Sequence, residues 1–177
     1  MKRIWFGWQA VGVAVVLCAA PSTKVFAQDS ALRQLLDEAD AAYARSDFSK
    51  AARAYDRAIK TAPKEVTPEG YGKRASIFAI EKRYQDGLRW ITGVAEAQYP
   101  DHVVIREQKA VVLAGLPGRR KDAVDVAEAV LKEKAESSTS HKIVGDFYSA
   151  ARSKPERVAL AYDAYLCRAR FPDLVRE

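Results

Sequence analysis

Apolar residues recur at spacings of three and four through residues 31–63 and outline two consecutive amphipathic helices. The first stripe consists of Leu32, Leu35, Leu36, Ala39, Ala42 and Tyr43. The polar stretch RSDFSK interrupts it, and Asp47 stands where it can cap a second helix. The second stripe runs through Ala51, Ala54, Tyr55, Ala58, Ile59 and Ala62 until Pro63 ends it. Because this spacing places side chains on one helix face, the segment predicts a helix–turn–helix unit.

The same pattern returns along the chain at a period of thirty-six residues. Small or apolar residues match in four columns: Ala39, Ala75, Val111 and Phe147; Ala42, Phe78, Ala114 and Ala150; Ala51, Gly87, Ala123 and Ala159; Ala58, Val94, Val130 and Leu166. The similar segments AQYPD at 97–101 and ARFPD at 169–173 end the second and fourth copies. We therefore expect four units, at about 31–63, 67–100, 103–136 and 139–173.

Cap and turn residues agree with this division. Residues suited to a helix cap or first turn stand at the expected starts, namely Thr67 before Pro68, Ser140, and Ser153 two residues before Pro155. Gly115 and Gly118 mark the turn inside the third unit.

At these residues the chain resembles the tetratricopeptide repeat family. The first unit matches best, with the family's positions filled by Ala39, Asp47, Phe48, Ala51, Tyr55, Ala58 and Pro63. The second unit keeps Ala75, Phe78, Tyr84 and Gly87, and the third keeps Ala123 and Gly118. The fourth departs furthest, with Asp163 where an apolar residue is usual. The resemblance implies an all-α fold, a right-handed superhelix of about four stacked antiparallel helix pairs.

The resemblance also implies where a partner binds, because first helices of that family line a concave groove that holds peptide segments. The groove positions carried over to this chain are Arg33, Asp40, Tyr43, Glu69, Gln108, His141, Tyr148 and Arg152, accompanied by Leu36, Ser76 and Val112. We therefore expect a protein- or peptide-binding adaptor or scaffold, with Tyr43 and Tyr148 bracketing an exposed groove. Any single member of this set can equally be an ordinary solvated surface residue.

Residues 1–27 are of a different kind. The basic start MKR precedes an uncharged apolar run, and Val25 and Ala27 form a small-x-small cleavage signature. This predicts a cleavable export signal, a mature domain at 28–177 and an exported, periplasmic location in a bacterial envelope. Gly7, Gln9 and Gly12 interrupt the apolar run, which makes a membrane span marginal, although a retained anchor stays an alternative. Leu17 stands where a lipoprotein signal needs a small residue, which argues against lipid attachment at Cys18.

Charge and cysteine content narrow the function classes further. The formal net charge of +6 falls to +3 once residues 1–27, with Lys2, Arg3 and Lys24, are removed. The remaining charges are interspersed, so we expect no nucleic-acid partner. Cleavage would also leave Cys167 as a lone cysteine, and the fold must then be held by its core rather than by an internal disulfide.

The sequence contains no pattern that indicates catalysis, and we expect neither a metal nor a cofactor. His102 and His141 have no histidine or cysteine at ligand spacing. There is no glycine-rich phosphate loop and no serine nucleophile elbow. Cys167 lies in an apolar stripe and is interpreted as a structural thiol. The segment GLPGRRKD is interpreted as an exposed basic turn.

A structural, self-assembling protein is the alternative function. Repeat arrays need a polar surface at each end to stay soluble. Tyr162, Tyr165, Leu166 and Leu174 would lie near an uncovered end after the fourth unit. That end could associate with another copy and form a homo-oligomer.

Overall fold

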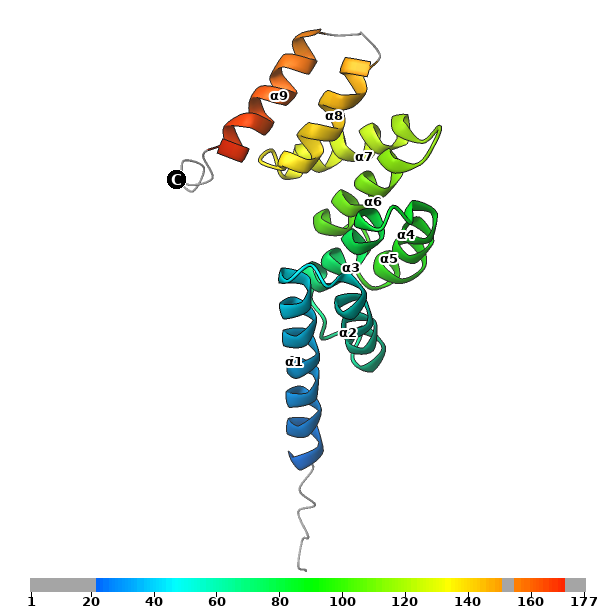
Figure 1. Cartoon of the computed structure of the whole chain (residues 1–177), viewed down its shortest axis with the longest axis vertical. Helices are drawn as coiled ribbons and strands as arrows, with labels where there is room; N and C mark the ends of the chain where they lie inside the picture. Colours follow the sequence, from blue (N-terminus) through cyan, green and yellow to red (C-terminus); the bar gives the residue numbers. More distant parts are fainter. Residues whose placement is uncertain (1–21, 151–154, 171–177) are drawn as a thin grey trace, which may run out of the picture.

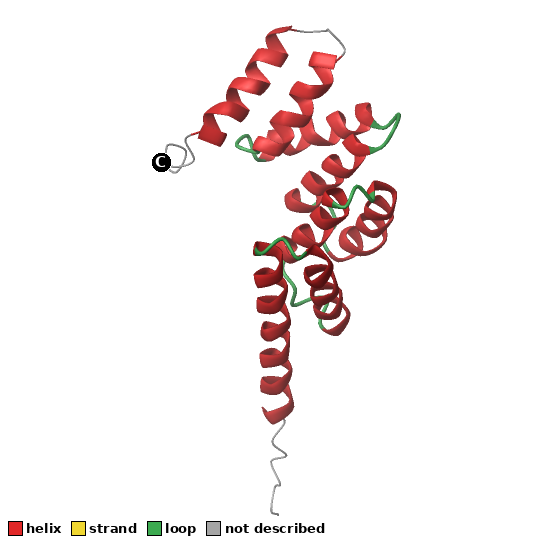
Figure 2. Ribbon diagram, in the orientation of Figure 1, coloured by secondary structure: helices red, strands yellow, loops and turns green. Residues whose placement is uncertain are grey.

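The computed structural model describes residues 22–150 and 155–170, and these residues form helices joined by short loops (Figures 1 and 2). The helices are α1 (Ser22–Ala44), α2 (Phe48–Thr61), α3 (Pro68–Ile80), α4 (Tyr84–Trp90), the π-helical turn η1 (Ile91–Ala95), α5 (Glu96–Gln98), α6 (Val103–Gly115), α7 (Arg120–Glu133), α8 (Ser138–Ala150) and α9 (Pro155–Arg170). The expected all-α class is therefore confirmed for the described residues.

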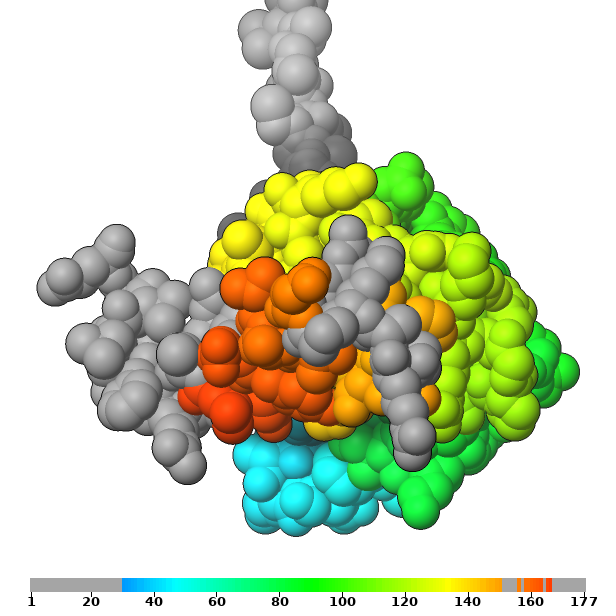
Figure 3. Space-filling view, turned by 90° about the horizontal axis from the view of Figure 1, so that it is seen from above, coloured from blue at the N-terminus to red at the C-terminus, as the bar shows by residue number. Residues whose placement is uncertain are grey.

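The helices form four consecutive pairs. In each pair a first helix packs against a second one: α1 against α2, α3 against the continuous α4–η1–α5 segment, α6 against α7, and α8 against α9. The pairs follow one another along the long axis of the molecule, from α1 to α9 (Figure 1). Seen from the C-terminal end of the molecule, α8 and α9 lie in front with α7 beside them (Figure 3).

The described part of the N-terminal region is helical. Helix α1 begins at Ser22, so it runs through the expected cleavage point after Ala27. The apolar run and Cys18 lie outside the described residues. Within the described ranges, none of the helices combines the length and apolar character needed to cross a bilayer.

The expected caps start the helices of the first two pairs. The Asp47 carboxylate accepts a hydrogen bond from the Lys50 backbone N–H at 3.1 Å and caps α2. The Thr67 hydroxyl accepts one from the Gly70 N–H at 3.4 Å, with Pro68 at the first helical position of α3. Ser140 lies in the first turn of α8, where its N–H donates to the Ser137 hydroxyl. Ser153 lies outside the described residues.

The core forms where the two apolar stripes of the first pair meet. Fully or nearly fully buried residues of the stripes are Leu32, Ala39, Ala42, Ala51, Ala54, Tyr55, Ala58, Ile59 and Ala62. The Tyr55 side chain is 0% exposed and is the largest residue among them. A continuous buried cluster then extends through Tyr71 of α3 and Ile91 of η1 to Ile105 of α6. The predicted apolar face of the first unit is therefore confirmed.

The repeat register differs from the expected one in the later first helices. Helices α3, α6 and α8 begin at residues 68, 103 and 138, at intervals of thirty-five rather than thirty-six. The small residue that follows Ala39 and Ala75 in this register is Ala110 and then Gly145, and both are buried. Val111 and Phe147, which the sequence pattern placed in this column, are only half-buried.

The second pair contains one extra residue, which the π-helical turn η1 absorbs. From its first residue to its C-cap, α2 runs from Phe48 to Ala62, whereas the corresponding segment runs from Tyr84 to Tyr99 and is one residue longer. Ala62 and Tyr99 end the two segments with nearly the same backbone angles, φ −146° and −131°, with ψ 72° in both. The predicted equivalence of Ala58 and Val94 is consequently wrong: Val94 is 36% exposed, and Ala95 is buried.

The fourth pair also departs from the expected columns. Ala159 is exposed and Leu166 is 46% exposed, whereas Ala161 is buried at 4%. Gly145 of α8 lies against Ala161 and Tyr162, at the distance where a Cβ on Gly145 would just touch both side chains. Ala161 and Tyr162 therefore occupy the places that Ala54 and Tyr55 occupy in the first pair. Leu174 and the side chain of Cys167 lie outside the described residues.

Replacing Tyr55 should test the core of the first pair. We expect Tyr55→Ala to lower the free energy of unfolding by about 3 kcal/mol or more, because it empties an aromatic-sized space between α1 and α2. Tyr55→Phe should cost only about 1 kcal/mol, since it removes the hydroxyl hydrogen bond and keeps the ring. Urea denaturation followed by circular dichroism measures both. Equal losses for the two variants would contradict this packing.

Deleting one residue from η1 should be tolerated. Gly93 has no atom within 4 Å of its would-be Cβ. Its deletion should convert the wide turn to regular α-helix and keep the unfolding free energy within about 1 kcal/mol of the parent. The control is deletion of the exposed Arg57 from α2, which turns the following residues by about 100°. It should cost at least about 3 kcal/mol, because Ala58 and Ile59 leave the core. Similar losses of unfolding free energy in the two deletion variants would contradict the interpretation that η1 contains one extra residue.

Candidate functional site

The first helices form a continuous row. Hydrogen bonds join α1 to α3, α3 packs against α6, and α6 packs against α8. Each first helix has a buried small residue at the corresponding position, namely Ala39, Ala75, Ala110 and Gly145. The residues one and four positions after it lie on the same side of the helix, and we call this set the first-helix face. It consists of Asp40, Ser76, Val111 and Asp146, one position after, and Tyr43, Ala79, Ala114 and Ser149, four positions after. All eight are half-buried or exposed, as residues of a binding surface must be.

Polar groups join the α1 and α3 parts of this face. The Tyr43 hydroxyl lies 2.9 Å from the Ser76 hydroxyl, and Ser76 donates to the Lys73 carbonyl, so Tyr43 is the donor to Ser76. The Asp40 carboxylate accepts hydrogen bonds from Lys73 at 2.9 Å and from the hydroxyl of Tyr55. Burial raises the pKa of Asp40, but the bonds from Tyr55 and Lys73 outweigh it and hold that pKa below its usual value.

The fourth pair repeats the aspartate–tyrosine contact of the first. Asp146 follows Gly145 as Asp40 follows Ala39, and its carboxylate accepts a hydrogen bond from Tyr162 of α9 at 2.8 Å. Lys142 lies 2.6 Å from the other carboxylate oxygen. The hydrogen bond to Asp146 raises the pKa of Lys142 and also that of Tyr162. An aspartate, a tyrosine and a lysine therefore meet at both ends of the first-helix face.

A hollow of about 420 Å³ opens beside this second aspartate, between α6, α8 and α9 and the start of α7. Its apolar lining consists of Ala114, Ile143, Phe147 and Ala150, and its polar lining of Arg120, Asp146, Ser149 and Tyr162. Cavities of this size are typical of small-ligand or side-chain pockets. The hollow joins the first-helix face because Ala114, Asp146 and Ser149 belong to both.

The expected groove residues of the first three units are exposed or half-buried, except Val112 of α6, which is fully buried and cannot face a groove. Arg33 of α1 is exposed. Glu69 is exposed in the first turn of α3, and hydrogen bonds from its own backbone N–H and from Thr67 lower its pKa. Gln108 is half-buried on α6, 3.9 Å from the would-be Cβ of Gly72 of α3. Asp40 and Tyr43 contact α3 directly, as described above.

The expected residues of the fourth unit lie elsewhere. Tyr148 donates a hydrogen bond to Glu128 of α7 at 3.1 Å. His141 donates from Nε2 to the Ala135 carbonyl at 2.8 Å and lines a separate hollow of about 280 Å³ with Leu131, Val144 and Leu160. The cause is the interval of thirty-five between the later first helices. Intervals of thirty-six place Tyr148 in the position of Asp40, whereas in the structure Asp146 occupies that position. Arg152 lies outside the described residues.

Tyr43 and Tyr148 are also less exposed than expected. Both rings are half-buried, Tyr43 against a buried cluster of α1, α2 and α3 and Tyr148 against a buried cluster of α6 to α9. Each meets a phenylalanine edge to face, with ring centroids 5.6 Å apart for Tyr43 and Phe48 and 5.4 Å for Tyr148 and Phe147. Removing either tyrosine therefore perturbs packing as well as any binding.

Sequence reasoning missed Arg120, Asp146, Ser149 and Tyr162 as members of a site. Counting from Gly145 instead of Phe147 would have found Asp146 and Ser149. Arg120 had been assigned to an exposed basic turn, and it is exposed at the first position of α7. Its place beside α8 depends on how the third and fourth pairs pack, which the sequence pattern does not specify.

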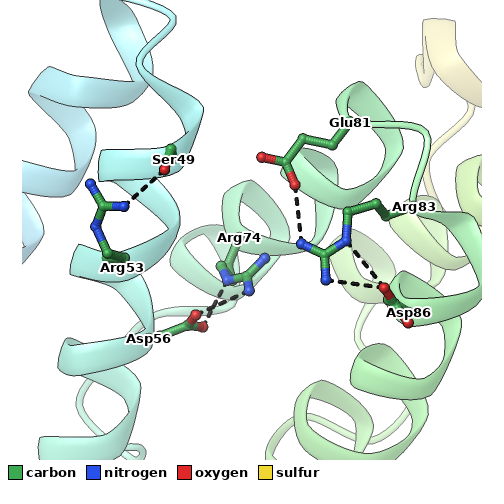
Figure 4. Close-up of polar contacts among 7 residues, drawn as sticks. All are labelled: Ser49, Arg53, Asp56, Arg74, Glu81, Arg83 and Asp86. Atoms are coloured by element: carbon green, nitrogen blue, oxygen red, sulfur yellow. Dashed lines mark hydrogen bonds and ion pairs between the residues drawn. The ribbon is translucent and has the colours of Figure 1, made fainter.

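A buried arginine joins the second helix of one pair to the next pair (Figure 4). Arg74 of α3 is 7% exposed and holds both carboxylate oxygens of Asp56 of α2, at 2.7 and 3.0 Å. Its guanidinium lies 4.1 Å from the Phe78 ring centroid and 5.5 Å from that of Trp90. Arg83 stands over the same phenylalanine and binds Glu81 and Asp86. Because the buried positive charge of Arg74 is paired with Asp56 within the protein, we interpret this cluster as structural.

The described residues offer no group of three or more histidine, cysteine, aspartate and glutamate side chains that could hold a metal ion. Comparison of the chain with protein-family models, with curated proteins and with solved structures finds no match. The functional argument therefore depends on the geometry of the first-helix face.

Arg74→Ala should lower the free energy of unfolding by about 2–3 kcal/mol, because it removes two charge-assisted hydrogen bonds and the contacts with two aromatic rings. Asp56 is half-exposed and can regain water, which limits the loss. Arg74→Lys should lie between the parent and the alanine variant, since lysine keeps the charge but not the two-point bond. Arg53→Ala, an exposed neighbour bonded only to Ser49 among the described residues, should change stability by less than about 0.5 kcal/mol. If urea denaturation shows that Arg53→Ala lowers the free energy of unfolding more than Arg74→Ala does, Arg74 is not the residue that joins the two pairs.

Proposed function

We propose that the chain is a non-catalytic adaptor or scaffold that holds a segment of a protein partner against the first-helix face. The observation that carries the proposal is the hollow between α6, α8 and α9, which combines apolar and polar lining on the same face. A mixed lining suits a peptide, because apolar side chains enter the pocket while polar groups fix the orientation of the bound chain.

The row of first helices supports the same function. Helix pairs that stack through consecutive first helices provide an extended surface, longer than a single pocket, on which a peptide can lie. We propose that the pairs wind as a right-handed superhelix of the tetratricopeptide kind. The export pattern of residues 1–27 further leads us to propose a role in the bacterial cell envelope, with the mature chain in the periplasm.

Self-assembly is the second candidate, and one observation favours it. Leu160 and Leu166 of α9 are 70% and 46% exposed, so the last helix presents large apolar side chains to solvent. Association of two copies through α9 would cover them. Light scattering on the purified chain separates the candidates, because an adaptor is expected to stay monomeric in the absence of its partner.

Filling the hollow tests the adaptor proposal. Ala150 is exposed and lines the hollow, so Ala150→Trp should block it with little change in stability. We expect crosslinked capture of partner from the native envelope to fall about tenfold or more, equivalent to roughly 1.4 kcal/mol. Matched controls are Ala97→Trp on the exposed side of α5, and the pair Lys60→Ala with Lys132→Ala on the second helices. Both controls should retain capture.

Two results would contradict this proposal. Unchanged capture by Ala150→Trp would show that the partner does not use the hollow. Loss of capture in the lysine pair alone would place the partner on the second helices instead.

A further inference from the structure

The apolar part of the hollow is shaped to receive one side chain. Ala114 and Ala150 are small and leave space, and Ile143 and Phe147 provide the apolar wall. Phe147 is half-buried and meets Tyr148 edge to face, so its ring is held in place by packing. An apolar side chain of a partner would be removed from water there, which favours binding.

The charges around the hollow are not balanced. The negative charge of Asp146 is compensated within the protein, because its carboxylate pairs with Lys142 and accepts a hydrogen bond from Tyr162. On either side of Arg120 in the sequence, Arg119 binds Asp122 and Lys121 lies 3.5 Å from Asp125. Arg120 itself makes no ion pair or hydrogen bond with any residue of the described ranges, and it lines the hollow. The uncompensated charge at this site is therefore positive.

Arginine suits one kind of anion particularly well. Its planar guanidinium can bind both oxygens of a carboxylate at once, and its charge persists at every physiological pH. The first backbone N–H groups of α7, beside Arg120, also favour a negative charge. A free inorganic anion would gain nothing from the apolar wall, whereas a carboxylate on a chain that also carries an apolar side chain uses both parts.

We propose that the hollow binds a peptide segment in which an apolar side chain is followed by an acidic residue. The apolar side chain packs against Ile143 and Phe147, and the carboxylate pairs with Arg120. This inference rests on the proposed adaptor function and adds the chemical class of the bound segment and the residue that selects it.

Two synthetic peptides test the proposal on the mature chain. The first is a fluorescein-labelled, amidated Gly-Ser-Phe-Asp-Glu-Ser-Gly, and the second replaces its two acids by asparagine and glutamine. We expect fluorescence anisotropy to show at least tenfold tighter binding of the acidic peptide. Arg120→Gln should reduce binding of the acidic peptide to that of the neutral one. The matched control is Lys121→Gln, which makes the same charge change one residue away and should retain at least half of the affinity.

Several outcomes would overturn the inference. Equal binding of the two peptides, or equal effects of Arg120→Gln and Lys121→Gln, would show that Arg120 selects nothing. Failure of both peptides to bind, while Ala150→Trp still abolishes partner capture, would reject this ligand class and leave the adaptor function standing. Should light scattering show a dimer that Ala150→Trp converts to monomer, the occupant of the hollow is a second copy of the chain.

Discussion

The close approach of two helices within each pair is the constraint on which the rest of the structure depends. It requires a residue with little or no side chain at the crossing. A Cβ on Gly87 would lie 2.8 Å from the Cβ of Phe78, and Ala51 in the first pair is 0% exposed. Because the crossing residues are so small, their polar neighbours come within reach of the partner helix. Asp40 follows Ala39 and meets Tyr55, and Asp146 follows Gly145 and meets Tyr162.

That constraint also explains how much of the fold could be predicted from the sequence. Small residues at helical spacing indicated the paired helices, and the caps at Asp47 and Thr67 located two helix starts correctly. The burial of Tyr55 followed from the same pattern. The register of the later pairs was not predicted correctly, because a constant period was assumed while the intervals between units vary by one residue. No local sequence signal marks the wide turn at Ile91–Ala95, whose residues are compatible with an ordinary helix.

The candidate site was predicted less well than the fold, for the same reason. An error of one residue turns a helical side chain by about 100°, which is enough to exchange a surface position for an interior one. Over three units the error accumulates to two residues, and Tyr148 was therefore assigned to the position that Asp146 occupies. The neighbours of Arg120 and Arg74 could not be predicted from sequence, since each of these residues contacts helices of another pair. Tertiary contacts of this kind are specified by packing and not by spacing along the chain.

The wide turn of the second pair has a consequence for how such a chain can change its length. An extra residue in a regular helix would displace every buried side chain that follows it. In this chain the extra residue is taken up over one turn: Ile91 and Ala95 remain buried, while Thr92, Gly93 and Val94 face solvent. The contact with the preceding pair is kept after the extra residue, because the Tyr99 hydroxyl donates a hydrogen bond to the Val66 carbonyl at 2.6 Å. A one-residue change in the length of one repeat can thus be accommodated within a single helical turn, and the packing of the neighbouring units stays the same.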